Sequence, residues 1–294
     1  MIRIIKNSFK FKNIFSLRKE KGIIFALYFI IMILIISLPQ NLAIIRNDGL
    51  KFNNIVIELN ELAKENPDQI LEKLPDGVIE KTVFVMDSRP LGNIETKKFE
   101  IAFYGQNEKY DEKKNLVAFE YDKVVYYDGN GNKLIGKYQS LDKRINLTDL
   151  KNQSKIANAN QTEIATEFIN GVTQVFSPYF IFQGVGITLL GNFLLNTLLL
   201  FIISAILLLV RVNYKKVATY TEFLKIYIAS YTLPVLIGVT LSLISYKYLA
   251  TFSQVIIQWG TPLMAVGSIF IGSKKENSEK TKKACNKKQE ASLK

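Results

Sequence analysis

The chain has 294 residues, a formal net charge of +12, no histidine and a single cysteine, Cys285. The lack of histidine excludes Ser-His-Asp and Cys-His catalysis, histidine zinc sites and a histidine pH switch. A single cysteine excludes an intramolecular disulfide, so any soluble domain must be stabilised by its core alone. The sequence carries no recognisable catalytic constellation, and we expect no enzymatic activity, no cofactor and no bound metal.

Four long stretches contain no Asp, Glu, Lys or Arg, and each is long enough for a helix to cross a hydrocarbon core of about 30 Å. They cover residues 22–45, 168–210, 226–246 and 248–272. Within the second stretch the crossing should be 179–210, because Ser177-Pro178 ends a preceding helix. The first stretch is far longer than the apolar part of a cleaved signal peptide, so we interpret it as an uncleaved anchor. The sequence therefore predicts an α-helical multi-pass membrane protein with four transmembrane helices.

The charged residues predict the orientation of these helices. Segments 1–21, 211–225 and 273–294 are strongly basic, whereas 46–167 is slightly acidic. Because an excess of Lys and Arg marks cytoplasmic segments, both termini should be inside (N-in/C-in), with 46–167 and the turn at Lys247 outside. The basic balance then reflects membrane topology, and we expect no nucleic-acid partner. The abundance of Lys, Asn and Ile favours a bacterial, Gram-positive source and thus the cell membrane.

Residues 46–178 combine helical and strand patterns and predict a small α+β extracytoplasmic domain. A helical pattern over 56–74 is interrupted at Pro67, and apolar residues at helical spacing over 158–176 predict an amphipathic helix against either the outer leaflet or the domain. Strand-like runs cover 78–86, 98–104, 115–120, 123–127 and 133–138. We expect a small antiparallel sheet, and residues 46–157 should fold independently.

The segment 128–132 reads Asp-Gly-Asn-Gly-Asn, whose residues accept positive φ and favour a hairpin turn. Its alternating oxygen-bearing side chains also resemble a calcium loop, but the later bidentate glutamate of such loops is missing. The pattern therefore favours the hairpin over a metal site.

The basic leader, residues 1–21, mixes bulky apolar residues with Lys and Arg. This mixture suits a helix that lies in the anionic inner interface of the membrane. The alternative is a frayed leader that only sets the orientation of the first helix. The Lys-rich tail, residues 273–294, is expected to be disordered.

Few polar residues lie within the predicted membrane helices, and none of them ionises at neutral pH. The candidate binding groups are Asn192, Asn196, Tyr231, Gln254 and Gln258. These groups could line the path of a neutral solute, or they could join helices through interhelical hydrogen bonds. Ion-coupled transporters usually place charged residues at membrane depth, so such a mechanism is disfavoured.

Four further residues have expected structural roles. Thr219 and Glu222 fit a capping box at the start of a helix. Pro234 and Pro262 lack an N–H and should each leave one helical carbonyl free, which nearby hydroxyls and amides can satisfy.

The segment 214–235 contains a Tyr-basic pair, an Ala-Ser-Tyr step and a Leu-Pro pair. These are Tyr214-Lys215, Ala229-Ser230-Tyr231 and Leu233-Pro234. With the basic leader, Leu38-Pro39 near the end of the first span and the clustered C-terminal spans, the segment resembles the bacterial membrane family called domain of unknown function 1189 (DUF1189). The resemblance implies a membrane protein; some members are labelled maltodextrin-utilisation membrane proteins. It supplies no functional residues to carry over.

Two classes of function fit the sequence. The first is a non-enzymatic accessory or sensor protein whose extracytoplasmic domain binds a ligand or a partner, which could be another membrane protein or a second copy of the chain. The second is a component of a permease for a neutral solute such as a maltodextrin-type sugar. Since the sequence carries a folded outer domain and no catalytic groups, we favour the first.

Overall fold

The computed structural model describes residues 1–47, 49, 54–89, 92–104, 115–213, 218–244 and 253–274. They form two compact units, which we call the helical unit (Met1–Ala43 with Gly186–Lys294) and the α+β unit (Ile44–Val185). The predicted turn at Lys247, the Tyr-basic pair at 214–215 and Cys285 lie outside the described residues.

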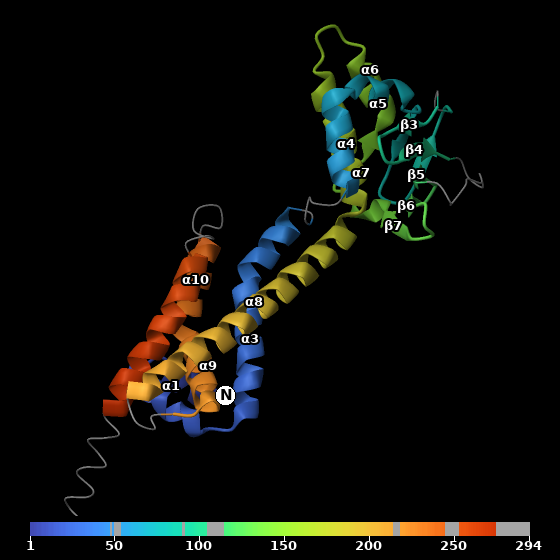
Figure 1. Cartoon of the computed structure of the whole chain (residues 1–294). Coiled ribbons are helices and arrows are strands. Elements are labelled where there is room, and N and C mark those ends of the chain that lie inside the picture. Colours follow the sequence, from blue (N-terminus) through green and yellow to red (C-terminus); the bar gives the residue numbers. More distant parts are fainter. Residues whose placement is uncertain are drawn as a thin grey trace, which may run out of the picture. The chain divides into compact units, whose positions relative to one another are not determined.

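Within these described residues, four helices are long and apolar enough to cross a membrane, and they dominate the helical unit (Figure 1). They are α3 (Gly22–Arg46), α8 (Ser177–Asn213), α9 with α10 (Tyr220–Ser230 and Thr232–Ile244) and the helix Ser253–Lys274. The first nine residues of α8 belong to the α+β unit. The third helix begins at Tyr220, directly after the predicted cap Thr219, and its charged first turns precede the apolar stretch that starts at 226.

The third helix is interrupted at Tyr231, between α9 and α10. Pro234 has no N–H to donate to the carbonyl of Ser230, and the regular ladder resumes with Val235 N donating to Tyr231 O at 2.9 Å. The hydroxyl of Thr232 donates to the carbonyl of Ala229 at 3.1 Å. The bond from Thr232 lies on the carbonyl of Ala229 and not on that of Ser230, so the predicted partner of the Ser230 carbonyl stays a prediction.

The basic leader is folded onto the helical unit. It forms α1 (Ile2–Ser8), α2 (Phe11–Ile14) and the 3₁₀ helix η1 (Phe15–Lys19). Ile4, Ile14 and Leu17 are almost fully buried in a core shared with α3, α9 and the helix Ser253–Lys274. The leader is therefore an ordered part of the bundle and not a frayed extension of α3.

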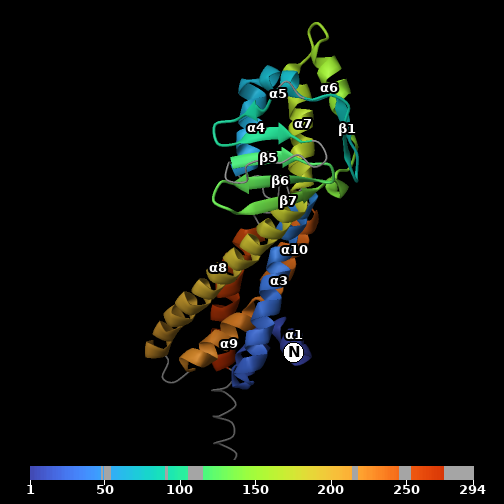
Figure 2. The same ribbon diagram turned by 90° about the vertical axis from the view of Figure 1, so that its right-hand side faces the viewer.

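The α+β unit contains a five-stranded sheet with the order β3-β4-β5-β6-β7 (Figure 2). Its strands are Ile94–Glu95, Glu100–Phe103, Asn115–Phe119, Lys123–Asp128 and Lys133–Lys137. β4 and β5 pair in parallel, and the other neighbours are antiparallel. The sheet is thus mixed, which corrects the expectation of a purely antiparallel one; strand direction depends on non-local pairing that a local pattern does not encode.

A second, three-stranded sheet has the order β2-β1-β8. β1 is Gly77–Ile79, β2 is Phe84–Met86 and β8 is Ile145–Asn146. The expected single strand over 78–86 is therefore a hairpin, because Glu80 and Lys81 are exposed and interrupt the apolar run. Asn146 also caps α6 (Leu147–Ser154), a helix that the sequence pattern did not reveal.

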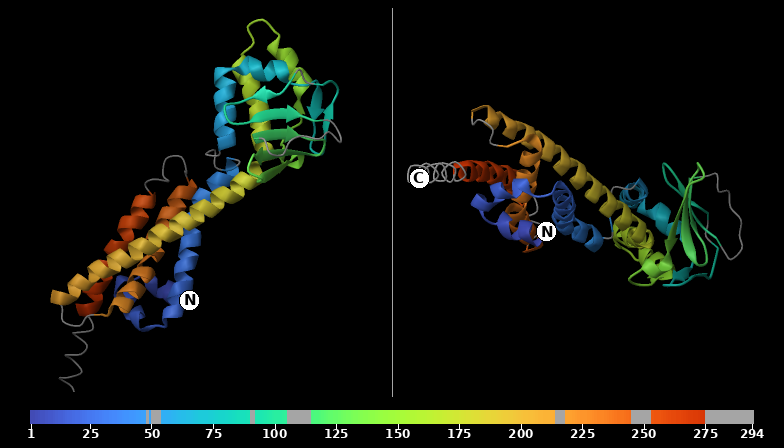
Figure 3. Two further views of the ribbon diagram at one scale, coloured as in Figure 1. Left: turned by 45° about the vertical axis from the view of Figure 1, so that its right-hand side comes forward. Right: turned by 90° about the horizontal axis from the view of Figure 1, so that it is seen from below.

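Helices α4 (Asn54–Glu65) and α7 (Gln161–Val175) pack on one face of the five-stranded sheet (Figure 3). α5 (Pro67–Lys73) follows α4 after the break at Pro67. Phe103 and Phe119 stack with ring centroids 4.9 Å apart, and Phe168 of α7 lies 6.0 Å from the Phe119 ring. The amphipathic helix expected over 158–176 therefore belongs to the core of the domain, so a folding unit that ends at 157 would lack part of its core.

The segment 128–132 forms the turn between β6 and β7, as predicted. One carboxylate oxygen of Asp128 accepts hydrogen bonds from the backbone N–H groups of Asn130 and Asn132, and the other accepts from the Asn132 side chain. Gly129 and Gly131 have φ of 71° and 93°, which residues with a Cβ rarely adopt. The Asp128 carboxylate therefore accepts the hydrogen bonds that close the turn, and the Asn132 side chain donates one of them.

Candidate functional site

A network of buried amides and hydroxyls connects α3, α8 and the α9–α10 break. Asn192 of α8 donates both amide hydrogens to α3, to Ser37 Oγ at 2.9 Å and to Gln40 Oε1 at 2.8 Å. One turn later, Asn196 donates to the backbone carbonyl of Asn192 at 2.8 Å and accepts from the Tyr231 hydroxyl at 3.2 Å. Three of the five predicted candidate groups therefore meet in one network.

A second contact joins α3 directly to the break. The hydroxyls of Tyr28 and Thr232 lie 2.6 Å apart, and both side chains are almost completely buried. The Tyr231 ring packs edge-on against Phe29 and Tyr227, with ring centroids 5.9 Å and 5.4 Å away. Aromatic packing and hydrogen bonds thus hold the broken part of the third helix against α3 and α8.

The two remaining candidates, Gln254 and Gln258, lie outside this network. Gln254 is half-buried and Gln258 is exposed, and neither side chain forms a hydrogen bond within the described part of the chain. Their helix instead meets α10 through small residues: a Cβ on Gly260 would lie 3.2 Å from Pro234. The structure therefore does not assemble all five candidate groups around one path.

The predicted capping box is present at the start of α9. Thr219 Oγ1 accepts from the Glu222 N–H, and the Glu222 carboxylate accepts from the Thr219 N–H at 2.7 Å. Glu222 also lies 3.7 Å from the buried guanidinium of Arg18. Lys225 donates to the carbonyls of Arg18 and Glu20 at 3.2 Å and 2.7 Å. These contacts fasten the leader to the third helix.

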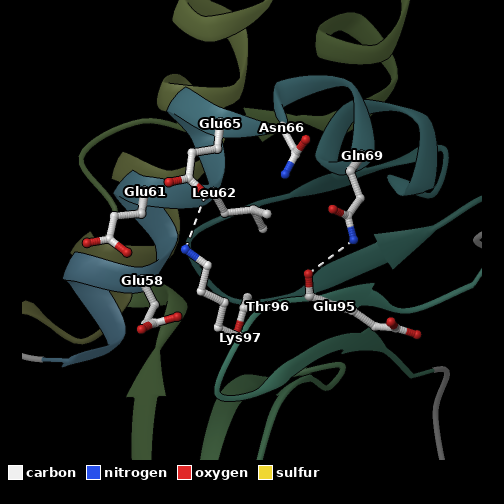
Figure 4. A pocket seen from close by; sticks show the side chains of 9 residues that line it. All are labelled: Glu58, Glu61, Leu62, Glu65, Asn66, Gln69, Glu95, Thr96 and Lys97. Atoms are coloured by element: carbon white, nitrogen blue, oxygen red, sulfur yellow. Dashed lines mark hydrogen bonds and ion pairs between the residues drawn. The ribbon is translucent and has the colours of Figure 1, made fainter.

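The α+β unit has a hollow of about 280 Å³ between α4, α5 and the β3–β4 turn (Figure 4). It is lined by Glu58, Glu61, Leu62, Glu65, Asn66, Gln69, Glu95, Thr96 and Lys97. The glutamates of α4 line it because they recur at i, i+3 and i+7, which places them on one face of a helix. The amide of Gln69 donates to the Glu95 backbone carbonyl at 3.1 Å and ties α5 to β3.

Two of the four carboxylates in the hollow are paired with lysines. Lys98 lies 2.7 Å from the buried carboxylate of Glu58, and this hydrogen bond is the main cause of the raised pKa of Lys98. Lys97 lies 3.3 Å from Glu65. Among the described residues no cation pairs with Glu61 or Glu95, and both are exposed. The hollow therefore presents negative charge to the solvent.

This arrangement can bind a ligand through charged and neutral hydrogen-bonding groups. Its groups are carboxylates, amides, a threonine hydroxyl and a lysine, and no described hydroxyl of the hollow is activated by a neighbouring base. Charge-assisted hydrogen bonds from an amine would satisfy the two unpaired carboxylates. The hollow joins residues about thirty positions apart, and only the acidic spacing of 58, 61 and 65 could have indicated it from the sequence.

Neither the curated proteins nor the solved structures contain a match to the chain. The model of one family, described as protein of unknown function (DUF1189), matches residues 2–266. This span includes the leader from residue 2, the whole α+β unit and the first 14 of the 22 residues of the last apolar helix. The chain therefore belongs to the DUF1189 family.

Proposed function

We propose that this protein is a non-enzymatic accessory or sensor of a bacterial, Gram-positive cell membrane. Four helices cross the membrane with both termini inside, and the α+β unit lies outside and binds a ligand or a partner protein. The observation that carries this proposal is the different use of polar groups in the two units. Asn192, Asn196 and Tyr231 bond to other helix residues, whereas Glu61 and Glu95 are exposed and have no paired cation among the residues that the structure describes.

The same observation weighs against a permease. A sugar path needs donors and acceptors that can bond to the solute, because an unpaired hydroxyl in a desolvated site costs about 1–3 kcal/mol. Both amide hydrogens of Asn192 are already used between α3 and α8. The side chain of Gln258 is exposed and points away from the contacts between the helices. The amides are better suited to holding the helices together.

The chemistry of the hollow favours a ligand that carries amines. Two unpaired carboxylates attract a cation, and Asn66, Gln69 and Thr96 supply neutral hydrogen-bonding groups at the rim. A basic peptide segment of a partner membrane protein, or of a second copy of this chain, has this chemistry. A neutral sugar could use the amides but would leave the carboxylates without a counter-charge.

The test is binding of a short oligolysine peptide, and of maltohexaose, to the purified full-length chain in detergent. Each charge-assisted hydrogen bond contributes about 1.5–3 kcal/mol, so Glu61→Gln with Glu95→Gln should weaken peptide binding at least about tenfold. The matched control, Glu72→Gln with Glu80→Gln, removes two exposed carboxylates outside the hollow and should leave binding unchanged. Equal loss in both pairs, or binding of maltohexaose alone, would contradict the proposed ligand class.

The topology has its own test, because Cys285 is the only cysteine. A membrane-impermeant maleimide should label it only after the cells are permeabilised, since its Lys-rich segment is expected inside. Labelling in intact cells would overturn the four-span topology and the extracytoplasmic position of the α+β unit.

A further inference from the structure

The leader has two faces with opposite surroundings. Ile4 and Ser8 of α1 are buried against the bundle, whereas Ile2, Ile5 and Phe9 are exposed at 83%, 38% and 43%. Residues 2, 5 and 9 follow each other at helical spacing and form one stripe. A helix that was held only by the bundle would leave this stripe without a partner.

The positively charged residues of the leader also fall into two groups, one that contacts the protein and one that is exposed. Its two arginines are used within the protein, because Arg18 is buried beside Glu222 and Arg3 lies 3.1 Å from Glu20. The five lysines are exposed and form no ion pair within the described part of the chain. They are Lys6, Lys10, Lys12, Lys19 and Lys21. The leader thus carries both an exposed apolar stripe and five exposed lysines without an ion pair in the described part of the chain.

The leader also lies at the ends of the apolar helices. It directly precedes α3, and Lys225 in the second turn of α9 donates to its carbonyls. A Cβ on Gly272, near the end of the helix Ser253–Lys274, would lie 2.2 Å from Phe15. If these helices span the bilayer, as we propose above, the leader lies at the boundary between hydrocarbon and water.

We propose that the leader is a docking surface for the anionic phospholipid leaflet. Ile2, Ile5 and Phe9 enter the boundary of the acyl chains, and Lys6, Lys10 and Lys12 contact the phosphates of anionic headgroups. The combination of apolar stripe and cations fits a membrane surface, where acyl chains accept Ile2 and the phosphates attract the lysines. This inference depends on membrane insertion of the helices but not on ligand binding by the α+β unit.

The single tryptophan, Trp259, makes a direct test possible. In a Trp259→Phe background, Phe9→Trp places the only indole on the proposed surface of the full-length chain. The chain is reconstituted into phosphatidylcholine nanodiscs that contain a minor fraction of either brominated phosphatidylglycerol or brominated phosphatidylcholine. The anionic quencher should reduce the fluorescence more strongly than the neutral one, because the lysines enrich anionic lipid around the leader.

Lys6→Gln with Lys10→Gln and Lys12→Gln should abolish this difference, since each lysine near an anionic surface enriches the lipid about fivefold. Lys133→Gln with Lys137→Gln and Lys143→Gln removes the same charge from exposed positions of the α+β unit and should leave the difference intact. Equal quenching by both lipids, no quenching, or equal loss in the two triple variants would overturn the proposal. In the unmodified chain, quenching of the 69% exposed Trp259 by both lipids separately reports whether the helices are inserted.

Discussion

Both units have an apolar core, but the helical unit also buries many polar side chains, whereas the described part of the α+β unit buries few. In the described part of the α+β unit, Glu58 and Ser177 are the only polar residues that are buried, and the core is built from phenylalanines and aliphatic residues. The helical unit buries amides and hydroxyls such as Asn192, Ser37 and Thr232. At the same time it exposes large apolar side chains, and Leu263 is 69% accessible.

The difference follows from the solvent that each unit requires. In water, burial of apolar surface stabilises a fold, so the α+β unit encloses its aromatic residues. In hydrocarbon there is no such gain between helices, and small residues with interhelical hydrogen bonds take its place. The α+β unit is thus stabilised by burial of aromatic residues, and the helical unit by hydrogen bonds between helices. Substitutions can remove either kind of contact separately.

The largest effect is expected when the aromatic core is divided by truncation. A fragment of residues 54–176 should be soluble and unfold cooperatively, whereas 54–157 lacks α7 and the buried Phe168, Ile169 and Val172. Their loss should exceed the whole stability of a domain of this size, typically about 5–15 kcal/mol. Circular dichroism during urea denaturation distinguishes the two fragments. Cooperative unfolding of the shorter fragment would show that α7 is dispensable to the core.

A smaller effect is expected from one side chain of that core. Phe168→Ala should destabilise the 54–176 fragment by about 3–5 kcal/mol, because it leaves a cavity beside Phe103 and Phe119. Ile135→Ala is the matched control, since Ile135 is 48% exposed and should change the stability by about 0.5 kcal/mol or less. Urea midpoints measure both. Similar losses at the two positions would contradict the proposed core.

Single amides of the helical unit should contribute less. Asn192→Leu removes two hydrogen bonds between α3 and α8 and should cost between about 0.6 and 1.7 kcal/mol. Gln258→Leu removes an exposed amide without hydrogen bonds and should cost nothing. Unfolding of the full-length chain in mixed micelles gives both values. A larger cost at Gln258 than at Asn192 would indicate that the fourth helix carries an interface of its own.

The smallest expected effect concerns the pH dependence of the α+β unit. Hydrogen bonds from Ser88 and Lys151 lower the pKa of Asp76 below its ordinary value of 3.8. The folded state therefore favours the carboxylate; this stabilisation is complete above pH 3.8 and is lost as the pH falls through the lower folded pKa. Asp76→Asn should make the acid unfolding curve of the 54–176 fragment shallower below pH 3.8. An unchanged slope would mean that the Asp76 contacts do not stabilise the fold.

The apolar helices could be predicted well from the sequence because a membrane helix excludes charge. For the third helix this rule gives only the apolar stretch from 226, and it was the capping box at Thr219 that predicted where the helix begins. Glu222 and Lys225 lie inside this helix, where the capping box and the carbonyls of the leader satisfy them. A charge-free criterion cannot anticipate charges that are neutralised by a segment two hundred residues away.

The candidate sites were predicted only where local spacing contained them. Asn192 and Asn196 are one turn apart on one helix, so the sequence indicated half of the network; Ser37, Gln40 and Tyr28 are distant partners and were missed. Likewise, the parallel pairing of β4 with β5 and the closure of the hollow by β3 depend on contacts between distant segments. Local patterns specify helices and strands, but tertiary contacts decide which residues meet.

The hydrogen bond between Ser37 and Asn192 can form only late in the synthesis of the chain. Its two residues are 155 positions apart, and Thr232 lies 204 positions after its partner Tyr28. At a synthesis rate of about 5–20 residues per second, α3 must exist for roughly 10–30 s before Asn192 is made. The aromatic core ends at Phe180, before Asn192 is added. The residues of the aromatic core are therefore all synthesised while α3 still lacks its hydrogen-bond partners Asn192 of α8 and Thr232 of α10.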